Sequence, residues 1–456
     1  MTNTNHIPTA GVSKPLPPKT GPLGLTRYQW AVLFAAWVGW GFDVFDGLLF
    51  NFVSTNAVPN LMHLSAKDPN AGKIAIYWTG IGTSILLVGW ALGGLLFGRV
   101  ADRIGRSRTL MLTMIVYALG TAACALAPNM PVLILFRFIA SLGIGGEWAA
   151  GASLVAEVVP EKRRVEAGAL LYTSAPAGLF LAVFVNSLIS GTIFKDNPDA
   201  AWRWVLASGL LPAFFAMGVR SFIKEPERWK ATDEQTRGKI SELFQPENIR
   251  LTISGFIPAL TVLLTWWTCN AFLQVIAGNL AMEHGKALGW DKTQINGLKQ
   301  DWITIGSNAF NIGGLIGTLL TIPAAKILGR KPMFAIYWVL SAAALLTAFG
   351  HRWPAETQLL MYFPIGLTVF GVFGSFTFYL PELFPTRLRA TGAGFCYNVG
   401  RLITAAGPIL IANTALKSKH FLDVSLHTMF YLGFIPLVAL LFLPLVIETK
   451  NRALAD

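Results

Sequence analysis

The sequence predicts an all-α membrane protein with twelve transmembrane helices in two pseudo-symmetric six-helix halves. Of 456 residues, 54% are hydrophobic and only 13% are charged, a balance that excludes a typical soluble protein. The apolar residues form about twelve continuous runs of roughly 18 to 24 residues, each long enough to cross a ~30 Å hydrocarbon layer. Paired motifs recur in the two halves of the chain, which indicates duplication.

Each span is drawn around one apolar run, and glycine or proline within a run is compatible with a helix that packs on other membrane helices. We expect spans at 30–53, 77–98, 109–127, 131–156, 167–190, 203–222, 252–276, 302–325, 333–350, 358–380, 391–413 and 427–447.

The polar segments divide the chain into five parts. Residues 1–26 contain five prolines and predict a flexible tail, and residues 223–251 form the longest charged segment, typical of a linker. The linker separates an N-terminal half at 27–222 from a C-terminal half at 252–447, and 448–456 form a C-terminal tail.

Two motifs mark the duplication. The segment E-V-V-P-E-K-R-R at Glu157–Arg164 reappears as E-L-F-P-T-R-L-R at Glu382–Arg389, 225 residues later. The loop ADRIGRSR at Ala101–Arg108 reappears as AKILGRKP at Ala325–Pro332, 224 residues later. Because both copies follow equivalent spans, they indicate the internal repeat of a class of secondary transporters.

The net charge of +12 reflects the orientation of the chain in the membrane rather than nucleic-acid binding. Of 36 Lys and Arg residues, 24 fall on the side of the termini, 10 on the other side and two deep within spans, with Arg203 and Arg220 at the ends of span 203–222 counted with the adjacent sides. The positive-inside rule therefore predicts that both termini are cytoplasmic, in a plasma or inner membrane. We expect the three cysteines to be small core residues, because they lie in separate apolar runs: Cys124, Cys269 and Cys396.

Four segments resemble the major facilitator superfamily. They are G-R-V-A-D-R-I-G-R-S-R at Gly98–Arg108, the segment Arg137–Glu157, E-P-E-R-W at Glu225–Trp229, and P-E-L-F-P-T-R-L-R-A-T-G-A-G at Pro381–Gly394. The G-G-E-W form is most similar to the sialate or monocarboxylate:proton branch. The resemblance implies the major facilitator fold and alternating access to a central site, and it leaves the substrate open.

The resemblance also implies a gate at the cytoplasmic ends of the helices. Asp102 would pair with the neighbouring half and hold the inner side shut, although a solvated loop charge is the simpler alternative. In the second copy Lys326 stands in the place of Asp102, so the two loops are not equivalent. The expected gating residues are Asp102, Arg103, Arg106, Arg108, Glu157, Arg164, Glu382 and Arg389.

Acidic residues within spans are candidates for proton coupling, because an ionised group there costs ~2.5 to 3.5 kcal/mol. Asp43 and Asp46 are three residues apart and so share one helix face. Glu147 follows three glycines that permit close helix approach. The alternatives are that an aspartate is a structural partner of Arg137, and that Glu147 makes a helix-packing hydrogen bond.

Arg401 is the strongest candidate for substrate binding. Its counterpart in the first half is Pro176, so the duplicated scaffold does not require an arginine there. A buried guanidinium suits a carboxylate, although Arg401 could instead pair with backbone carbonyls. The other candidates, each also explicable by interhelical contacts, are Arg137, Asn270, Gln274, Asn308, Asn311 and Tyr397.

These residues predict proton-coupled symport of a small organic anion, such as a monocarboxylate, a sialic acid or an aromatic acid. A neutral sugar:proton symporter is the main alternative, and a transport-inactive membrane sensor is a lesser one. Motifs of hydrolases, metalloproteases and P-loop enzymes do not occur, so we expect no enzyme and no cofactor or metal. The expected partners are substrate, protons and lipid, not nucleic acid, and the expected functional unit is a monomer.

Overall fold

The computed structural model describes most of the chain, including both halves of the expected bundle. The described residues are 21–64, 71–104, 106–194, 197–210, 218, 239–385, 387–417 and 421–451.

The described part of the chain is helical and contains no strand. The first half comprises α1 (Arg27–Leu61), α2 (Ala71–Ile104), α3 (Arg106–Ala125), α4 (Met130–Val158), α5 (Arg164–Tyr172), α6 (Ser174–Leu188) and α7 (Pro198–Ala207). The second half comprises α10 (Ile249–Ala287), α11 (Lys292–Pro323), α12 (Arg330–Phe349), α13 (Ala355–Leu360), α14 (Tyr362–Ile365), α15 (Phe376–Leu383), α16 (Arg389–Thr404), α17 (Ala406–Lys417), α18 (Phe421–Leu432) and α19 (Phe434–Leu441).

The all-α membrane fold is confirmed. Eleven described segments are long and apolar enough to cross a membrane. The remaining expected span, 203–222, begins in α7, and most of it lies outside the described residues. The chain therefore fits a bundle of twelve membrane helices. The expected linker, 223–251, is described only from residue 239, and its role as a divider stays a prediction.

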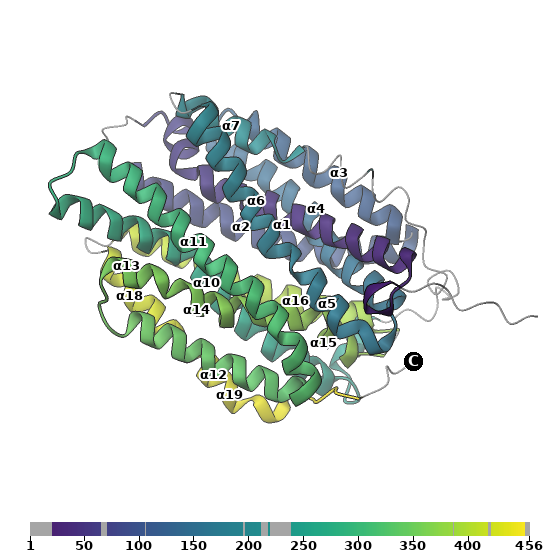
Figure 1. Ribbon diagram of the computed structural model, residues 1–456. Helices are drawn as coiled ribbons and strands as arrows, with labels where there is room; N and C mark the ends of the chain where they lie inside the picture. The colour runs from purple at the N-terminus through teal and green to yellow at the C-terminus, as the bar shows by residue number, and fades with distance from the viewer. Residues whose placement is uncertain are drawn as a thin grey trace, which may run out of the picture.

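The two halves lie side by side, with α1 to α7 along one side of the molecule and α10 to α19 along the other (Figure 1). Helices α2 of the first half and α16 and α17 of the second pack together, and α5 and α6 pack against α11. The start of α1 and the C-terminal end of the chain lie at the same end of the bundle (Figure 1).

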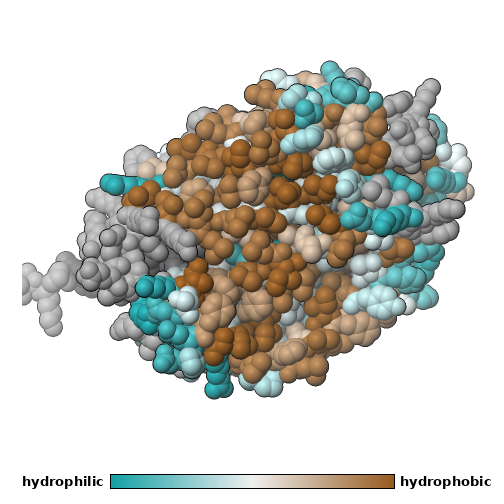
Figure 2. Space-filling view, turned by 180° about the vertical axis from the view of Figure 1, so that it is seen from behind, coloured by the Kyte–Doolittle hydropathy of each residue, from teal (hydrophilic) through white to brown (hydrophobic). Residues whose placement is uncertain are grey.

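The outer surface matches a lipid environment. Figure 2 shows a broad zone of hydrophobic side chains across the middle of one face, with hydrophilic side chains gathered toward the two ends. Exposed leucines and isoleucines, among them Leu119, Ile316 and Leu410, contribute to this surface. A surface of this kind suits a bilayer, because lipid chains rather than water solvate it.

Four expected spans are interrupted at a helix end that lies four residues before a proline. Helix α5 ends at Tyr172, four residues before Pro176, and the span resumes as α6. Proline has no backbone N–H, so it leaves the carbonyl four residues earlier without its helical partner. The same spacing separates the ends of α13, α16 and α18 from Pro364, Pro408 and Pro436.

Helices α10 and α11 extend beyond the expected spans at the end away from the termini. Helix α10 continues to Ala287, whereas the apolar run ends at 276, and α11 begins at Lys292 rather than near 302. A capping box at Asp291 and Gln294 starts α11. These added turns carry polar side chains that a hydropathy pattern assigns to a loop.

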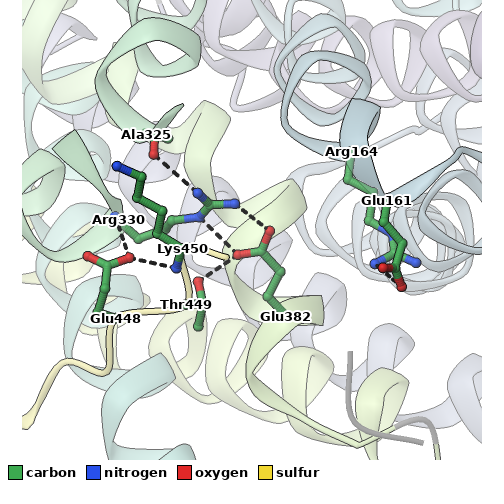
Figure 3. A network of polar contacts seen from close by, with 8 residues as sticks. All are labelled: Glu161, Arg164, Ala325, Arg330, Glu382, Glu448, Thr449 and Lys450. Atoms are coloured by element: carbon green, nitrogen blue, oxygen red, sulfur yellow. Dashed lines mark hydrogen bonds and ion pairs between the residues drawn. The ribbon is translucent and has the colours of Figure 1, made fainter. Parts of the chain in front are cut away.

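The N terminus of α12 is capped by a carboxylate from the end of the chain. The Arg330 backbone N–H donates to the Glu448 carboxylate over 2.9 Å (Figure 3). The Lys331 backbone N–H donates to the same carboxylate over 3.0 Å. A carboxylate at this position also interacts favourably with the helix dipole. The preceding residue, Gly329, has φ +104°, and a Cβ there would lie 2.5 Å from Glu448 Oε2.

Gly329→Ala should therefore destabilise the protein, by about 1 to 3 kcal/mol, because alanine strains the backbone and displaces the Glu448 cap. Gly297→Ala is the matched control, since Gly297 lies in α11 with open space around its Cβ position. Thermal unfolding in detergent should show a lower midpoint for the first variant only. Equal midpoints for the two variants would contradict this interpretation of the cap.

Candidate functional site

Five ionisable side chains are buried inside the bundle, as the sequence led us to expect. Asp43, Asp46 and Glu147 are 1 to 2% exposed, Arg401 is 3% exposed and Arg137 is 5% exposed. They come from α1, α4 and α16. Close packing positions Glu147 on α4, because a Cβ at the neighbouring Gly145 would lie 1.9 Å from the Trp90 carbonyl of α2.

Asp46 and Arg137 lie within the first half. The Thr121 hydroxyl donates to Asp46 Oδ2 over 2.5 Å, and Arg137 donates to the Gly47 carbonyl over 3.0 Å. The Arg137 guanidinium also lies 4.6 Å from the ring centroid of Phe50. Asp46 attracts Arg137 without a direct ion pair between them. Both groups are thus held by contacts inside one half.

Arg401 lies at the interface between the halves. Its guanidinium is 4.1 Å from the ring centroid of Trp90 and 4.5 Å from that of Tyr397, so two aromatic faces surround the charge. Its Nη1 donates to Asn398 Oδ1 over 3.3 Å, and its Nε has no hydrogen-bond partner among the described residues. Asp43 of the first half exerts an electrostatic attraction on it.

Aromatic side chains connect this cation to the rest of the interface. Trp90 meets Trp267 edge to face at 6.3 Å, and Trp267 meets Trp266 at 4.8 Å. On α5, Tyr172 stacks on Phe373 at 5.7 Å. These rings are contributed by both halves and fill the centre of the molecule.

A cavity of about 170 Å³ lies between the halves at the end away from the termini. Asn270 and Gln274 line it, as does Trp267. Asn270 and Gln274 also line a second cavity of about 20 Å³, together with Asn311. Arg401 lines neither described cavity. Two aromatic rings lie between Arg401 and the larger cavity. Trp267 lines this cavity and contacts Trp90, and Trp90 contacts Arg401.

Two candidate residues differ from their expected surroundings. The side chain of Asn308 lines neither described cavity, and its buried Oδ1 has no hydrogen-bond partner in the described part of the chain. Tyr397 is 2% exposed and contacts Arg401 and the rings of Phe373 and Phe376. The structure therefore places Tyr397 in the aromatic centre rather than on a cavity wall.

The end of the bundle near the termini is closed by ion pairs that the sequence analysis did not identify. Lys326 Nζ of the second half lies 2.5 Å from Glu166 Oε1 of α5, and Arg163 contacts the same carboxylate at 3.0 Å. Lys326 stands in the place of Asp102 in the second motif copy, so the charge at this position is reversed. The partner of Lys326, Glu166, lies in the first half.

A second network holds the same end of the second half together (Figure 3). Arg330 donates to both Glu382 oxygens, over 3.0 and 2.7 Å, and to the Ala325 carbonyl. The Thr449 hydroxyl donates to Glu382 over 2.6 Å. Glu382, an expected gating residue, thus joins α15 to α12 and to the C-terminal tail.

The other expected gating residues are only partly described. Arg164 lies 3.5 Å from Glu161, Arg389 donates to the Pro381 carbonyl over 3.0 Å, and Arg108 is exposed. The side chains that lie outside the described part are those of Asp102, Arg103, Arg106 and Glu157.

Among the described residues outside the spans, the Glu242 carboxyl has a lowered pKa. Glu242 precedes α10 and accepts a hydrogen bond of 2.8 Å from the Lys239 backbone N–H. That bond and the Arg387 guanidinium hold the pKa of Glu242 below its usual value. This ion pair joins the end of the linker to the segment between α15 and α16.

Two helical halves, a buried charged interface and a cavity between the halves are the features of a membrane transporter. The described cysteines are buried and free, so they serve as core residues. The family model of the Major Facilitator Superfamily matches residues 26–408, and the chain belongs to this family.

Individual relatives agree with this assignment. A Haemophilus influenzae protein named for metabolite transport is 28% identical and covers 94% of this chain and 99% of its own length. A sialic acid transporter of Escherichia coli is 25% identical and covers 87% of this chain and 90% of its own. The solved proton:xylose symporter XylE superposes with a TM-score of 0.71 over 94% of this chain and 98% of its own, at 18% identity. That likeness shows the shared fold.

The ion pair between Glu166 and Lys326 should keep the terminal end shut. Lys326→Gln should increase labelling of a cysteine introduced at Thr377, which is 4% exposed and faces the closed end of the interface. Lys326→Glu should increase it further, because two carboxylates would then repel. Labelling of the Thr377→Cys protein with a membrane-permeant maleimide measures this effect.

The matched control is Lys331→Gln, which removes the same charge from a side chain that contacts only the second half, at Pro444. The three native cysteines are buried and give the background. If Lys326→Gln and Lys331→Gln label alike, the cross-half pair is not a gate.

Proposed function

We propose that the protein is a proton-coupled symporter of a small organic anion, acting as a monomer in the plasma membrane with both termini in the cytoplasm. The orientation rests on the excess of Lys and Arg on the terminal side, 24 against 10. The monomer suffices because one chain supplies both walls of the cavity. The substrate class rests on a single observation, the environment of Arg401.

Arg401 carries a charge in a buried interface without a direct ion pair to a described residue. The rings of Trp90 and Tyr397 compensate this charge in part, and Asn398 accepts one of its hydrogen bonds. The Nε–H remains available. A planar guanidinium with free donors binds a carboxylate through two parallel hydrogen bonds, which no neutral group can reproduce.

Coupling to protons follows from competition for Arg401. In the empty transporter Asp43 attracts Arg401 across the interface. An arriving carboxylate competes for Arg401 and weakens this attraction, which makes an ionised Asp43 less favourable in a low-dielectric environment. Protonation of Asp43 removes that charge, so substrate and proton bind most favourably together. Asp46 and Glu147 are the further candidates for the coupling proton.

Transport requires the two ends to open in turn. The cavity leads from the outer end to Trp267, and Trp90 then covers Arg401. The ion pair of Glu166 and Lys326 closes the opposite end. Movement of Trp90 would expose Arg401 to the cavity, and separation of the ion pair would open the cytoplasmic side.

A neutral sugar is the second candidate substrate. The carboxamides of Asn270 and Gln274 line the cavity and suit hydroxyl groups, and the solved proton:xylose symporter shares the fold. The sialic acid transporter among the relatives favours an organic acid instead. Substrate competition in proteoliposomes with an imposed pH gradient, using sialic acid, lactate, benzoate and hexoses, distinguishes the two classes.

Arg401→Lys should weaken binding of the transported acid by at least tenfold, because lysine keeps the charge but loses the planar fork. Arg401→Ala should weaken it at least as much. The neutral amide of the same acid should bind weakly to the wild type. Its affinity should fall little further in Arg401→Ala. Binding of the acid to Arg401→Lys with wild-type affinity would show that Arg401 is structural.

Asp43→Asn should abolish accumulation driven by a pH gradient and retain part of substrate counterflow, which needs no net proton movement. Asp46→Asn is the comparison, since Thr121 and Arg137 hold Asp46 inside the first half. Uptake and counterflow are measured on the same proteoliposomes. Normal accumulation by Asp43→Asn would assign the coupling proton to another acid.

A further inference from the structure

The outer cavity contains a cation that the sequence pattern places in a loop. Lys299 precedes the expected span at 302–325, but α11 begins at Lys292, so Lys299 lies on a helix and lines the cavity. Its alkyl stem packs over Gly278 of α10, where an added Cβ would lie 3.1 Å from Lys299 Cε. The glycine thus makes room for the lysine between α10 and α11.

The described residues lining this cavity include no acid. Lys299 has no hydrogen bond or ion pair to any described residue, and its side chain is only partly exposed. A partly desolvated ammonium without a fixed counterion attracts a mobile anion, because an anion restores the interactions that water no longer supplies.

The amides of the cavity fall into two groups. Asn51, Asn186 and Asn279 each make a hydrogen bond within the protein, with Thr83, Ser190 and the Val275 carbonyl. The second group, Asn270, Gln274 and Gln300, makes no such bond to the described residues and remains available to a ligand.

Apolar side chains form much of the remaining walls. Trp267, Phe52, Ile303 and Ile411 contribute apolar surface. The volume of about 170 Å³ is close to the ~150 Å³ of an engineered apolar cavity that accommodates benzene. A six-membered ring with one carboxylate fits a space of this volume.

We infer that the outer cavity is a binding site for a single-ring monocarboxylate, with Lys299 binding the carboxylate and Trp267 contacting the ring. The inference rests on the proposed transport of organic anions and narrows their class. It also means that the substrate carboxylate binds two cationic side chains in succession. Lys299 binds it in the outer cavity, and Arg401 binds it after Trp90 moves.

Equilibrium binding of benzoate to the full-length protein in lipid nanodiscs tests the site. Lys299→Gln should weaken benzoate binding about tenfold, the effect of losing one charge-assisted hydrogen bond. Lys299→Arg should retain most of the affinity. Benzamide, the neutral isostere, should bind weakly and respond little to Lys299→Gln.

Lys286→Gln is the matched control. Lys286 is exposed near the end of α10, on the same side of the membrane, and does not line the cavity. Its loss changes the surface charge equally, so it should leave benzoate affinity unchanged. Equal affinities of wild type and Lys299→Gln for benzoate would overturn the role of Lys299.

Failure of this site can be distinguished from failure of the proposed function. If sialic acid binds and is transported while benzoate does not bind, the single-ring class is wrong and organic-anion transport stands. If only neutral hexoses bind, with equal affinity for wild type and Lys299→Gln, both the site and the organic-anion proposal are wrong.

Discussion

An ionised side chain within the membrane must be neutralised by a nearby group, and the centre of this protein depends on that constraint. Three acids and two arginines are buried there. Asp46 and Arg137 are held within one half by hydrogen bonds to their own neighbours. Asp43 and Arg401 instead attract each other from opposite halves. In the proposed function, a substrate anion and a proton replace this attraction across the interface.

The same constraint explains the asymmetry between the halves. A duplicated scaffold would place equivalent charges in both copies, yet Arg401 has proline as its counterpart and Lys326 has Asp102. Arg401 lies among rings contributed by both halves. Lys326 reaches Glu166 in the first half. Loss of symmetry in the sequence therefore coincides with contacts between the halves.

Much of the architecture could be predicted from the sequence because membrane helices follow from local composition. The apolar runs, and the burial of the five central charges, needed no knowledge of tertiary contacts. The partners of those charges could not be predicted without tertiary contacts. Asp43 and Arg401 are far apart in the chain, as are Glu166 and Lys326. Lys299 was missed because the hydropathy pattern begins the span only at residue 302, whereas α11 begins at Lys292. The helix breaks were missed although prolines follow them.

A structure of the substrate complex tests the central claim most directly. The account predicts that the substrate carboxylate accepts two hydrogen bonds of about 2.7 to 2.9 Å from the Arg401 guanidinium. It also predicts that the Trp90 ring has moved off the arginine to admit the ligand. A substrate bound only by Asn270 and Gln274, with Arg401 still enclosed between Trp90 and Tyr397, would contradict it.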